Sequence, residues 1–191
     1  MALHDLANSE TILPSQIVLD TSFLLALRPL DDNPHAAAAQ SFARRLRPRV
    51  QALELAVWLV MPVLQECYHI ILTGKLRRVW QAMEPQARPA NWLALYKQTP
   101  ETLQKGFVEM EQFDTLLATF PVTLARPDDL LREPTAPLLE ERLRYFIGRY
   151  HLLPQDALIL AEAERMGITA VATLDKDWRR VTEFDIYTTP L

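Results

Sequence analysis

Cysteine, glycine and long apolar runs are all scarce in this 191-residue sequence. The single cysteine, Cys67, excludes an internal disulfide framework and is typical of a reducing compartment. Only four glycines favour a helix-rich chain over an all-β fold with many tight turns. The longest apolar stretch, residues 53–64, is interrupted by Glu54 and Pro62 and is too short to span a bilayer. Because no Lys or Arg precedes Arg28, the N-terminus does not resemble a signal peptide, and we expect a cytoplasmic protein with no membrane partner.

The overall composition is that of an ordinary globular protein, with 49% apolar and 23% charged residues. This length favours one domain spanning residues 1–191 over two full domains. The net charge of −4 argues against a general nucleic-acid coat, which needs a broadly basic face. An enzyme that reaches a phosphodiester through bound cations stays compatible with this charge.

Apolar runs alternate along the chain with segments of helical periodicity. Strands are predicted at 16–20, 55–61, 168–173 and 184–188, with a short strand within 120–129, and helices at 33–47, 62–74, 137–150 and 155–167. For residues 55–61, periodicity alone leaves a helix nearly as plausible as a strand. The helix at 33–47 is expected to start with Asn33 as N-cap, and the helix from Pro62 is expected to end at Gly74. Such alternation predicts an α/β fold, with a parallel sheet covered by helices on both faces.

The middle of the chain departs from this alternation. Residues 84–92 are loop-like, and a helix is predicted to start at residues 99–101. Its apolar face would consist of Leu103, Phe107, Met110 and Leu117. We therefore expect residues 76–135 to be a helical insertion whose apolar face is buried against the core, a second subunit or a partner.

Four acidic residues occur where acids are unexpected. Asp20 and Asp175 come at the ends of predicted strands, and in open parallel sheets ligands bind at this carboxyl edge. Glu66 and Asp156 lie in helical segments that are otherwise apolar. Buried carboxylates are costly unless they are paired, hydrogen-bonded or bound to a cation. If the four converge, Mg²⁺ or Mn²⁺ would offset their repulsion, because these ions prefer hard oxygen ligands.

Each acid also has a purely structural interpretation. Asp20 and Asp175 could serve as turn residues at the ends of their strands. Asp156 could stabilise a helix N-terminus through the helix dipole. Glu66 could face solvent if its helix is rotated from the predicted phase. These interpretations stay open for each residue taken singly.

Four segments together resemble the PIN-domain family. They are "IVLDTSFLLAL", "LQECYHI", "PQDALILAEAERMGITAVATLDKDW" and the closing "FDIYT". The resemblance covers roughly residues 16–74 and 145–188. It implies a three-layer α/β/α fold with a parallel sheet of about five strands. It also assigns Asp20, Glu66, Asp156 and Asp175 as the catalytic, metal-binding acids, with Asp177 as an accessory ligand and Thr21 and Thr173 as supporting hydroxyl groups.

The resemblance implies a Mg²⁺- or Mn²⁺-dependent endoribonuclease that cuts RNA with metal-activated water, often the toxin of a VapBC-type toxin–antitoxin pair. RNA and an antitoxin protein would then be its partners, and we expect a homodimer. Two alternatives are a phosphatase of the haloacid dehalogenase type and a non-catalytic binding module with the PIN fold. The phosphatase family has a second Asp two residues after the Asp that ends its first strand, and this chain has Ser22 at that position.

Overall fold

The computed structural model describes residues 2–28, 33–125 and 137–190. The chain divides into two compact units, of which the first comprises Met1–Leu64 and Phe120–Leu191 and the second Gln65–Thr119. The second unit overlaps the predicted insertion at 76–135, whose last ten residues lie outside the described part of the chain. Within the described ranges, no helix is both long and apolar enough to cross a membrane.

The first unit is built on a parallel six-stranded sheet with the order β1-β6-β5-β2-β3-β4. The strands are β1 (Leu3–Asp5), β2 (Gln16–Leu19), β3 (Ala56–Leu59), β4 (Thr123–Leu124), β5 (Ala170–Ala172) and β6 (Asp185–Thr188). This confirms the predicted α/β class with a parallel sheet. In the central strand β2, Ile17, Val18 and Leu19 are fully buried, because a parallel sheet is covered on both faces. Strand β1 was not predicted, and the part of the predicted 120–129 strand beyond Ala125 lies outside the described residues.

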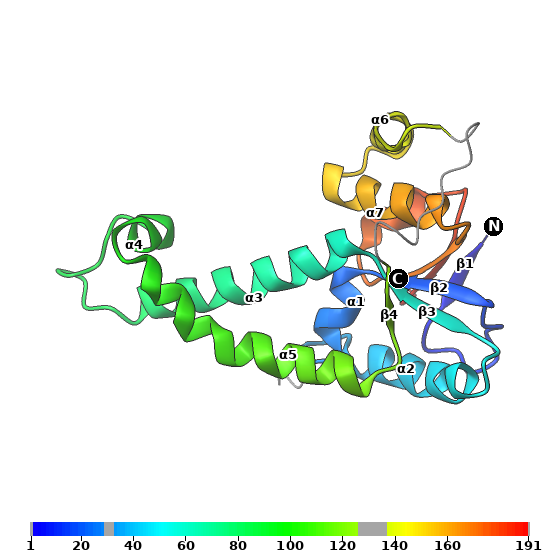
Figure 1. Cartoon of the computed structure of the whole chain (residues 1–191), viewed down its shortest axis with the longest axis horizontal. Helices are drawn as coiled ribbons and strands as arrows, with labels where there is room; N and C mark the ends of the chain where they lie inside the picture. Colours follow the sequence, from blue (N-terminus) through cyan, green and yellow to red (C-terminus); the bar gives the residue numbers. More distant parts are fainter. Residues whose placement is uncertain (1, 29–32, 126–136, 191) are drawn as a thin grey trace. The chain divides into compact units, whose positions relative to one another are not determined.

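Helices cover both faces of this sheet. They are α1 (Thr21–Ala26), α2 (Ala36–Gln51), α6 (Leu139–Tyr150) and α7 (Pro154–Arg165), and a 3₁₀ helix, η3 (Lys176–Arg180), follows β5. Figure 1 shows α1 and α2 on one side of the sheet and α6 and α7 on the other, which is the predicted three-layer arrangement. On the α2 side, Phe42 packs edge-on against Phe23 and also contacts Tyr187 of β6.

The start of α2 corrects one prediction from the sequence. Asn33 is not the N-cap, because the helix begins at Ala36 and its N-cap is His35, which makes no side-chain capping bond. Instead, the Asn33 Oδ1 accepts a hydrogen bond from the His35 N–H at 2.9 Å. Such a local turn is the alternative that Asn offers to capping.

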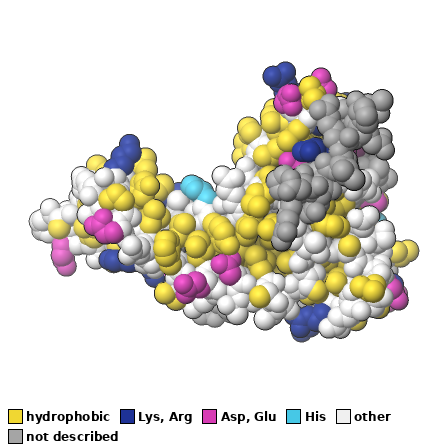
Figure 2. Space-filling view, in the orientation of Figure 1, with side chains coloured by type: hydrophobic (Ala, Val, Ile, Leu, Met, Phe, Trp, Pro, Cys, Tyr) yellow, Lys and Arg dark blue, Asp and Glu magenta, His cyan; other side chains and the backbone are white. Residues whose placement is uncertain are grey.

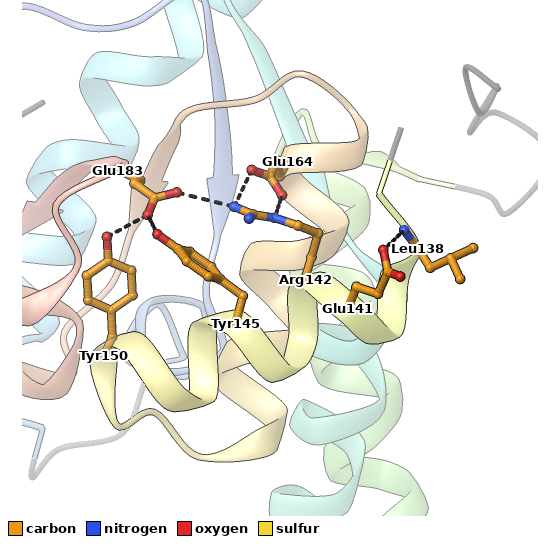
Figure 3. Close-up of polar contacts among 7 residues, drawn as sticks. All are labelled: Leu138, Glu141, Arg142, Tyr145, Tyr150, Glu164 and Glu183. Carbon is orange, nitrogen blue, oxygen red and sulfur yellow. Dashed lines mark hydrogen bonds and ion pairs between the residues drawn. The ribbon is translucent and has the colours of Figure 1, made fainter. Parts of the chain in front are cut away.

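Helix α6 is held in place by a polar network that Figure 3 shows in close-up. The Arg142 guanidinium donates to both carboxylate oxygens of Glu164 in α7, at 2.5 and 2.7 Å, and to Glu183 at 3.2 Å. Tyr145 and Tyr150 also donate to Glu183. Burial alone would raise the pKa of Glu183, but these hydrogen bonds and the charge of Arg142 outweigh it and lower that pKa. The network therefore ties α6 to α7 and to the loop before β6.

The second unit is helical. It contains most of α3 (Met61–Gln81), together with α4 (Trp92–Gln98), η1 (Pro100–Gly106) and α5 (Phe107–Thr119). Helix α4 was not predicted, and α3 does not end at Gly74 as expected. A Cβ atom at Gly74 would have only one neighbour, an Arg78 nitrogen at 3.9 Å, so this glycine is an ordinary helix-interior residue. At Gly106, in contrast, a Cβ would lie 2.9 Å from Leu72 Cδ2, so the absence of a side chain permits close packing there.

The apolar face predicted for residues 103–117 is only partly correct. Leu103, Met110 and Leu117 are half-buried, whereas Phe107 is 44% exposed, and the fully buried residue of α5 is Phe113, which was not predicted. Ile70, Leu93 and Val108 of the same unit are also exposed. Figure 2 shows hydrophobic side chains along the surface that α3 and α5 form.

Candidate metal and catalytic site

Asp20 occupies the junction between β2 and α1. Its carboxylate is only 3% exposed, and it is the N-cap residue of α1. Its Oδ2 accepts hydrogen bonds from the Ser22 hydroxyl at 2.7 Å, the Thr173 hydroxyl at 2.8 Å and the Ser22 N–H at 3.3 Å. The carboxylate is therefore held in one orientation at the carboxyl end of the central strand.

Burial raises the pKa of Asp20 above its ordinary value of 3.8. Hydrogen bonds from Ser22, Thr173 and the Thr21 N–H act in the opposite direction but do not cancel the effect of burial. A negative charge at this position is therefore costly for the folded protein. A bound cation would offset that cost.

A short hydrogen-bonded bridge connects Asp20 to the residues that follow β5. Thr173, which donates to Asp20, also accepts the Asp175 N–H at 3.1 Å. Ser22 likewise accepts the Leu174 N–H at 2.9 Å. The Asp175 carboxylate caps η3, since its Oδ1 accepts the Asp177 N–H at 2.8 Å. Strands β2 and β5 are neighbours, so Asp20 and Asp175 belong to the same edge of the sheet.

Asp156 lies in the first turn of α7. The adjacent Gln155 donates its side-chain N–H to the Pro62 carbonyl at 2.8 Å. Pro62 comes three residues after β3 ends at Leu59, on the carboxyl side of that strand. The N-terminus of α7 therefore lies at the sheet edge that also carries Asp20 and Asp175, and Asp156 is half-buried there.

The remaining predicted residues are placed less centrally. Asp177 is exposed and forms an ion pair of 3.2 Å with Arg180, one helical turn later. Thr21 is buried in the first position of α1. Glu66 is half-buried on the portion of α3 that belongs to the second unit.

The donor set of the first unit matches the chemistry of a hard divalent cation. Among the described residues, no group of three or more His, Cys, Asp or Glu side chains is close enough to form a complete metal centre. Mg²⁺, however, is commonly held by only one or two carboxylates, with water and substrate phosphate completing its shell. The buried Asp20 carboxylate, with Asp175 linked to it through Thr173, meets that smaller requirement.

Ser22 is the residue that sequence reasoning missed. Its hydroxyl donates to Asp20 and accepts from Leu174, so it connects both strand ends. The available signal was a hydroxyl residue two positions after a strand-ending Asp, which is a common local hydrogen-bonding pattern. From the sequence, Ser22 served only as evidence against a phosphatase.

Comparison with known proteins places the chain in a family. The family model described as "PIN domain" matches residues 17–183. No curated protein sequence matches the chain significantly. Among solved structures, VapBC2 from Rickettsia felis, bound to a DNA fragment from its promoter, is 14% identical; the match covers 91% of this chain and 98% of that one, with a TM-score of 0.46. VapC20 of Mycobacterium tuberculosis, a sarcin–ricin loop cleaving toxin, is 17% identical, with 85% and 92% of the chains covered and a TM-score of 0.44.

Proposed function

Because the chain belongs to the PIN-domain family, we propose that it is a Mg²⁺- or Mn²⁺-dependent endoribonuclease that hydrolyses RNA phosphodiester bonds. The observation that carries the proposal is the buried Asp20 carboxylate at the carboxyl edge of the sheet, connected through Thr173 to Asp175. Burying a charged carboxylate costs free energy unless a cation neutralises it. In open parallel sheets, ligands bind at the carboxyl edge, where Asp20 lies.

In this proposal Asp20, Asp156 and Asp175 hold the cation, with Glu66 as a fourth acid and Asp177 as an accessory ligand. When bound, the ion would lower the pKa of a water molecule and stabilise charge on the phosphate. The chain itself would supply orientation. The hydroxyl groups of Ser22 and Thr173 fix the Asp20 carboxylate, and the Thr173 hydroxyl also fixes the backbone of Asp175.

The test is cleavage of single-stranded RNA by the full chain with Mg²⁺, with Mn²⁺ and with EDTA. We expect activity only with metal, and we expect Asp20→Asn and Asp175→Asn each to abolish it, because each removes a ligand charge. Asp114→Asn is a matched control, since Asp114 is an exposed acid whose hydrogen bond from Tyr68 the amide oxygen can accept. Cleavage by purified Asp175→Asn at the wild-type rate would refute the assignment.

We also propose that this nuclease is the toxin of a VapBC-type pair, on the strength of the sequence resemblance. Induced expression of the wild type should then arrest growth, while Asp20→Asn should not. Co-expression with a small DNA-binding protein encoded beside it should restore growth and yield a stable complex. Growth unaffected by active enzyme would indicate a housekeeping nuclease instead.

A homodimer is the third part of the proposal. Ile70, Leu93, Phe107 and Val108 expose apolar surface on the second unit, and exposed apolar patches are typical of interfaces. Light scattering of the isolated protein should give twice the chain mass, and Val108→Glu should reduce it to a monomer. A wild-type monomer at micromolar concentration would exclude this interface.

A further inference from the structure

A second feature lies on the same edge of the sheet, outside the acidic site. It is a pocket of about 290 Å³ at the carboxyl ends of β1 and β6, and its walls include His4, Asp5, Arg179 and Thr188. Asp5 and Thr188 are register partners on neighbouring strands. The pocket therefore combines a cation and a carboxylate with a mainly apolar lining, which includes Leu3 and Pro190, within a single compact unit.

Arg179 supplies the positive charge of this pocket. One of its terminal N–H groups donates to the Thr189 carbonyl at 2.7 Å, which anchors the guanidinium at the pocket wall. Within the described ranges, Arg179 forms no ion pair with a carboxylate. A guanidinium has five N–H donors in a planar fork, so most of its capacity for a phosphate oxygen stays available.

Asp5 supplies an acceptor of fixed orientation. Its Oδ1 accepts the Ala7 N–H at 2.8 Å, which positions the side chain at the end of β1. An ionised carboxylate offers about four lone-pair sites, so acceptor capacity beyond this bond remains. In dinucleotide-binding α/β folds, an acidic side chain accepts the 2′-hydroxyl of a ribose in this way.

The pocket is spatially connected to the acidic site through η3. Asp175 caps the N-terminus of this helix, and Arg179 lies in its last turn. At about 2 Å of rise per residue, the two positions are roughly 8 Å apart along the 3₁₀ helix. Strands β2 and β6 are separated only by β5, which gives about 10 Å between Asp20 and the pocket edge. Both estimates correspond to one or two nucleotides of an RNA strand.

We propose that this pocket binds one ribonucleotide of the RNA strand, adjacent to the nucleotide that is cleaved. Arg179 contacts its phosphate, and Asp5 accepts its ribose 2′-hydroxyl, the group by which a protein distinguishes RNA from DNA. The inference rests on the proposed ribonuclease function, because it assigns the pocket to the same substrate.

The experiment measures binding rather than cleavage. Full-length protein in EDTA is titrated against a labelled single strand of about eight nucleotides, made as RNA, DNA and 2′-O-methyl RNA of one sequence. Arg179→Gln is compared with Arg44→Gln, which removes an exposed arginine of α2 and changes net charge equally. Asp5→Ala is compared with Glu10→Ala, an exposed acid of the same N-terminal segment. Melting temperatures confirm that each variant is folded.

We expect Arg179→Gln to weaken binding of all three strands about tenfold and to reduce the slope of log affinity against log salt by about 0.7, the value for one phosphate contact. Asp5→Ala should weaken RNA binding severalfold and leave DNA and 2′-O-methyl RNA unchanged. If Arg179→Gln behaves like Arg44→Gln, or Asp5→Ala affects RNA and DNA equally, the pocket is not a ribonucleotide site.

Asp20→Asn separates this inference from the proposed function. In the Asp20→Asn background, RNA binding in EDTA should keep its dependence on Arg179, because neither pocket contact involves Asp20. RNA binding that depends on Arg179, in a protein that cleaves no RNA with any divalent metal, would refute the proposed function and keep the subsite. Absence of RNA binding by the wild type would overturn the subsite.

Discussion

Replacing Asp20 by Asn tests the cation site through stability, independently of any substrate. The amide oxygen of Asn can still accept hydrogen bonds from Ser22 and Thr173 and can still cap α1, because Asn is as good an N-cap residue as Asp. The substitution therefore removes the buried charge and keeps an oxygen in the place of the Asp20 Oδ2. A cation that binds only the folded protein, at about 100 times its dissociation constant, adds roughly 2.7 kcal/mol to the free energy of unfolding.

For a chain of this size, 1 kcal/mol corresponds to roughly 2–4 °C in melting temperature. We therefore expect Mn²⁺ to raise the melting temperature of the wild type by about 5–10 °C over EDTA. In Asp20→Asn the increase should be much smaller. In EDTA near pH 7 the variant should melt as high as the wild type or higher, because the desolvated charge is gone.

The pH dependence follows from the raised pKa of Asp20, which burial places above 3.8. The folded state holds the proton more tightly than the unfolded state. The resulting stabilisation is fully present below the unfolded pKa and is lost as the pH rises through the folded pKa. In EDTA, the melting temperature of the wild type relative to Asp20→Asn should therefore fall as the pH rises above the ordinary aspartate pKa of 3.8 and through the raised pKa of Asp20.

The assay is a set of circular-dichroism melting curves for both proteins, with Mn²⁺ and with EDTA, across this pH range. Asp114→Asn is the control, and its response to metal should equal that of the wild type. An equal Mn²⁺ effect in wild type and Asp20→Asn would refute the cation site. If the wild type is more stable than Asp20→Asn in EDTA at every pH, then Asp20 serves only as the N-cap of α1.

Further predictions concern packing. Gly74→Ala should stabilise the protein by about 1 kcal/mol, because the position is helix interior with open space, while Gly106→Ala should gain less, because the Leu72 side chain 2.9 Å away must move aside. The melting temperature should therefore rise more in Gly74→Ala than in Gly106→Ala, and a loss in Gly74→Ala would contradict a continuous α3. Arg142→Met should cost about 1 kcal/mol, because Glu164 loses both hydrogen bonds from the guanidinium while Glu183 keeps those from Tyr145 and Tyr150. The exposed control Arg144→Met should cost little, and equal shifts in melting temperature would show that the network does not contribute to stability.

The sequence predicted the buried strands well because their signal is strong. Residues 17–19 and 170–172 are continuous apolar runs followed by an acid or a hydroxyl residue, as a strand buried on both faces requires. Strand β1 is only three residues long and partly exposed, so it carries no such run. Its partner strand β6 provides its hydrogen bonds, and pairing between residues 183 positions apart leaves no local pattern.

Predictions from local sequence patterns were wrong where tertiary packing determines where a helix ends and which side chains are buried. Gly74 was predicted to end a helix, but a single glycine costs only about 1 kcal/mol in a helix, and packing elsewhere along α3 outweighs it. Phe107 was assigned to a buried face because it fits the helical spacing. The observed 3₁₀ segment at residues 100–106 advances the chain by a different angle per residue, which rotates the helix after it and exposes Phe107.

For the site, the structural and functional interpretations of the acids turn out to be compatible. Asp175 does cap a turn, through its Oδ1, as the simpler interpretation required. That bond holds the carboxylate still and leaves its Oδ2 without a hydrogen-bond partner in the described part of the chain. A capped acid is thus a pre-oriented ligand, since the entropy of fixing the side chain is already lost on folding. The sequence alone could not reveal this, because the hydroxyl groups that hold Asp20 come from Ser22 in α1 and Thr173 after β5, which are 151 positions apart in the sequence.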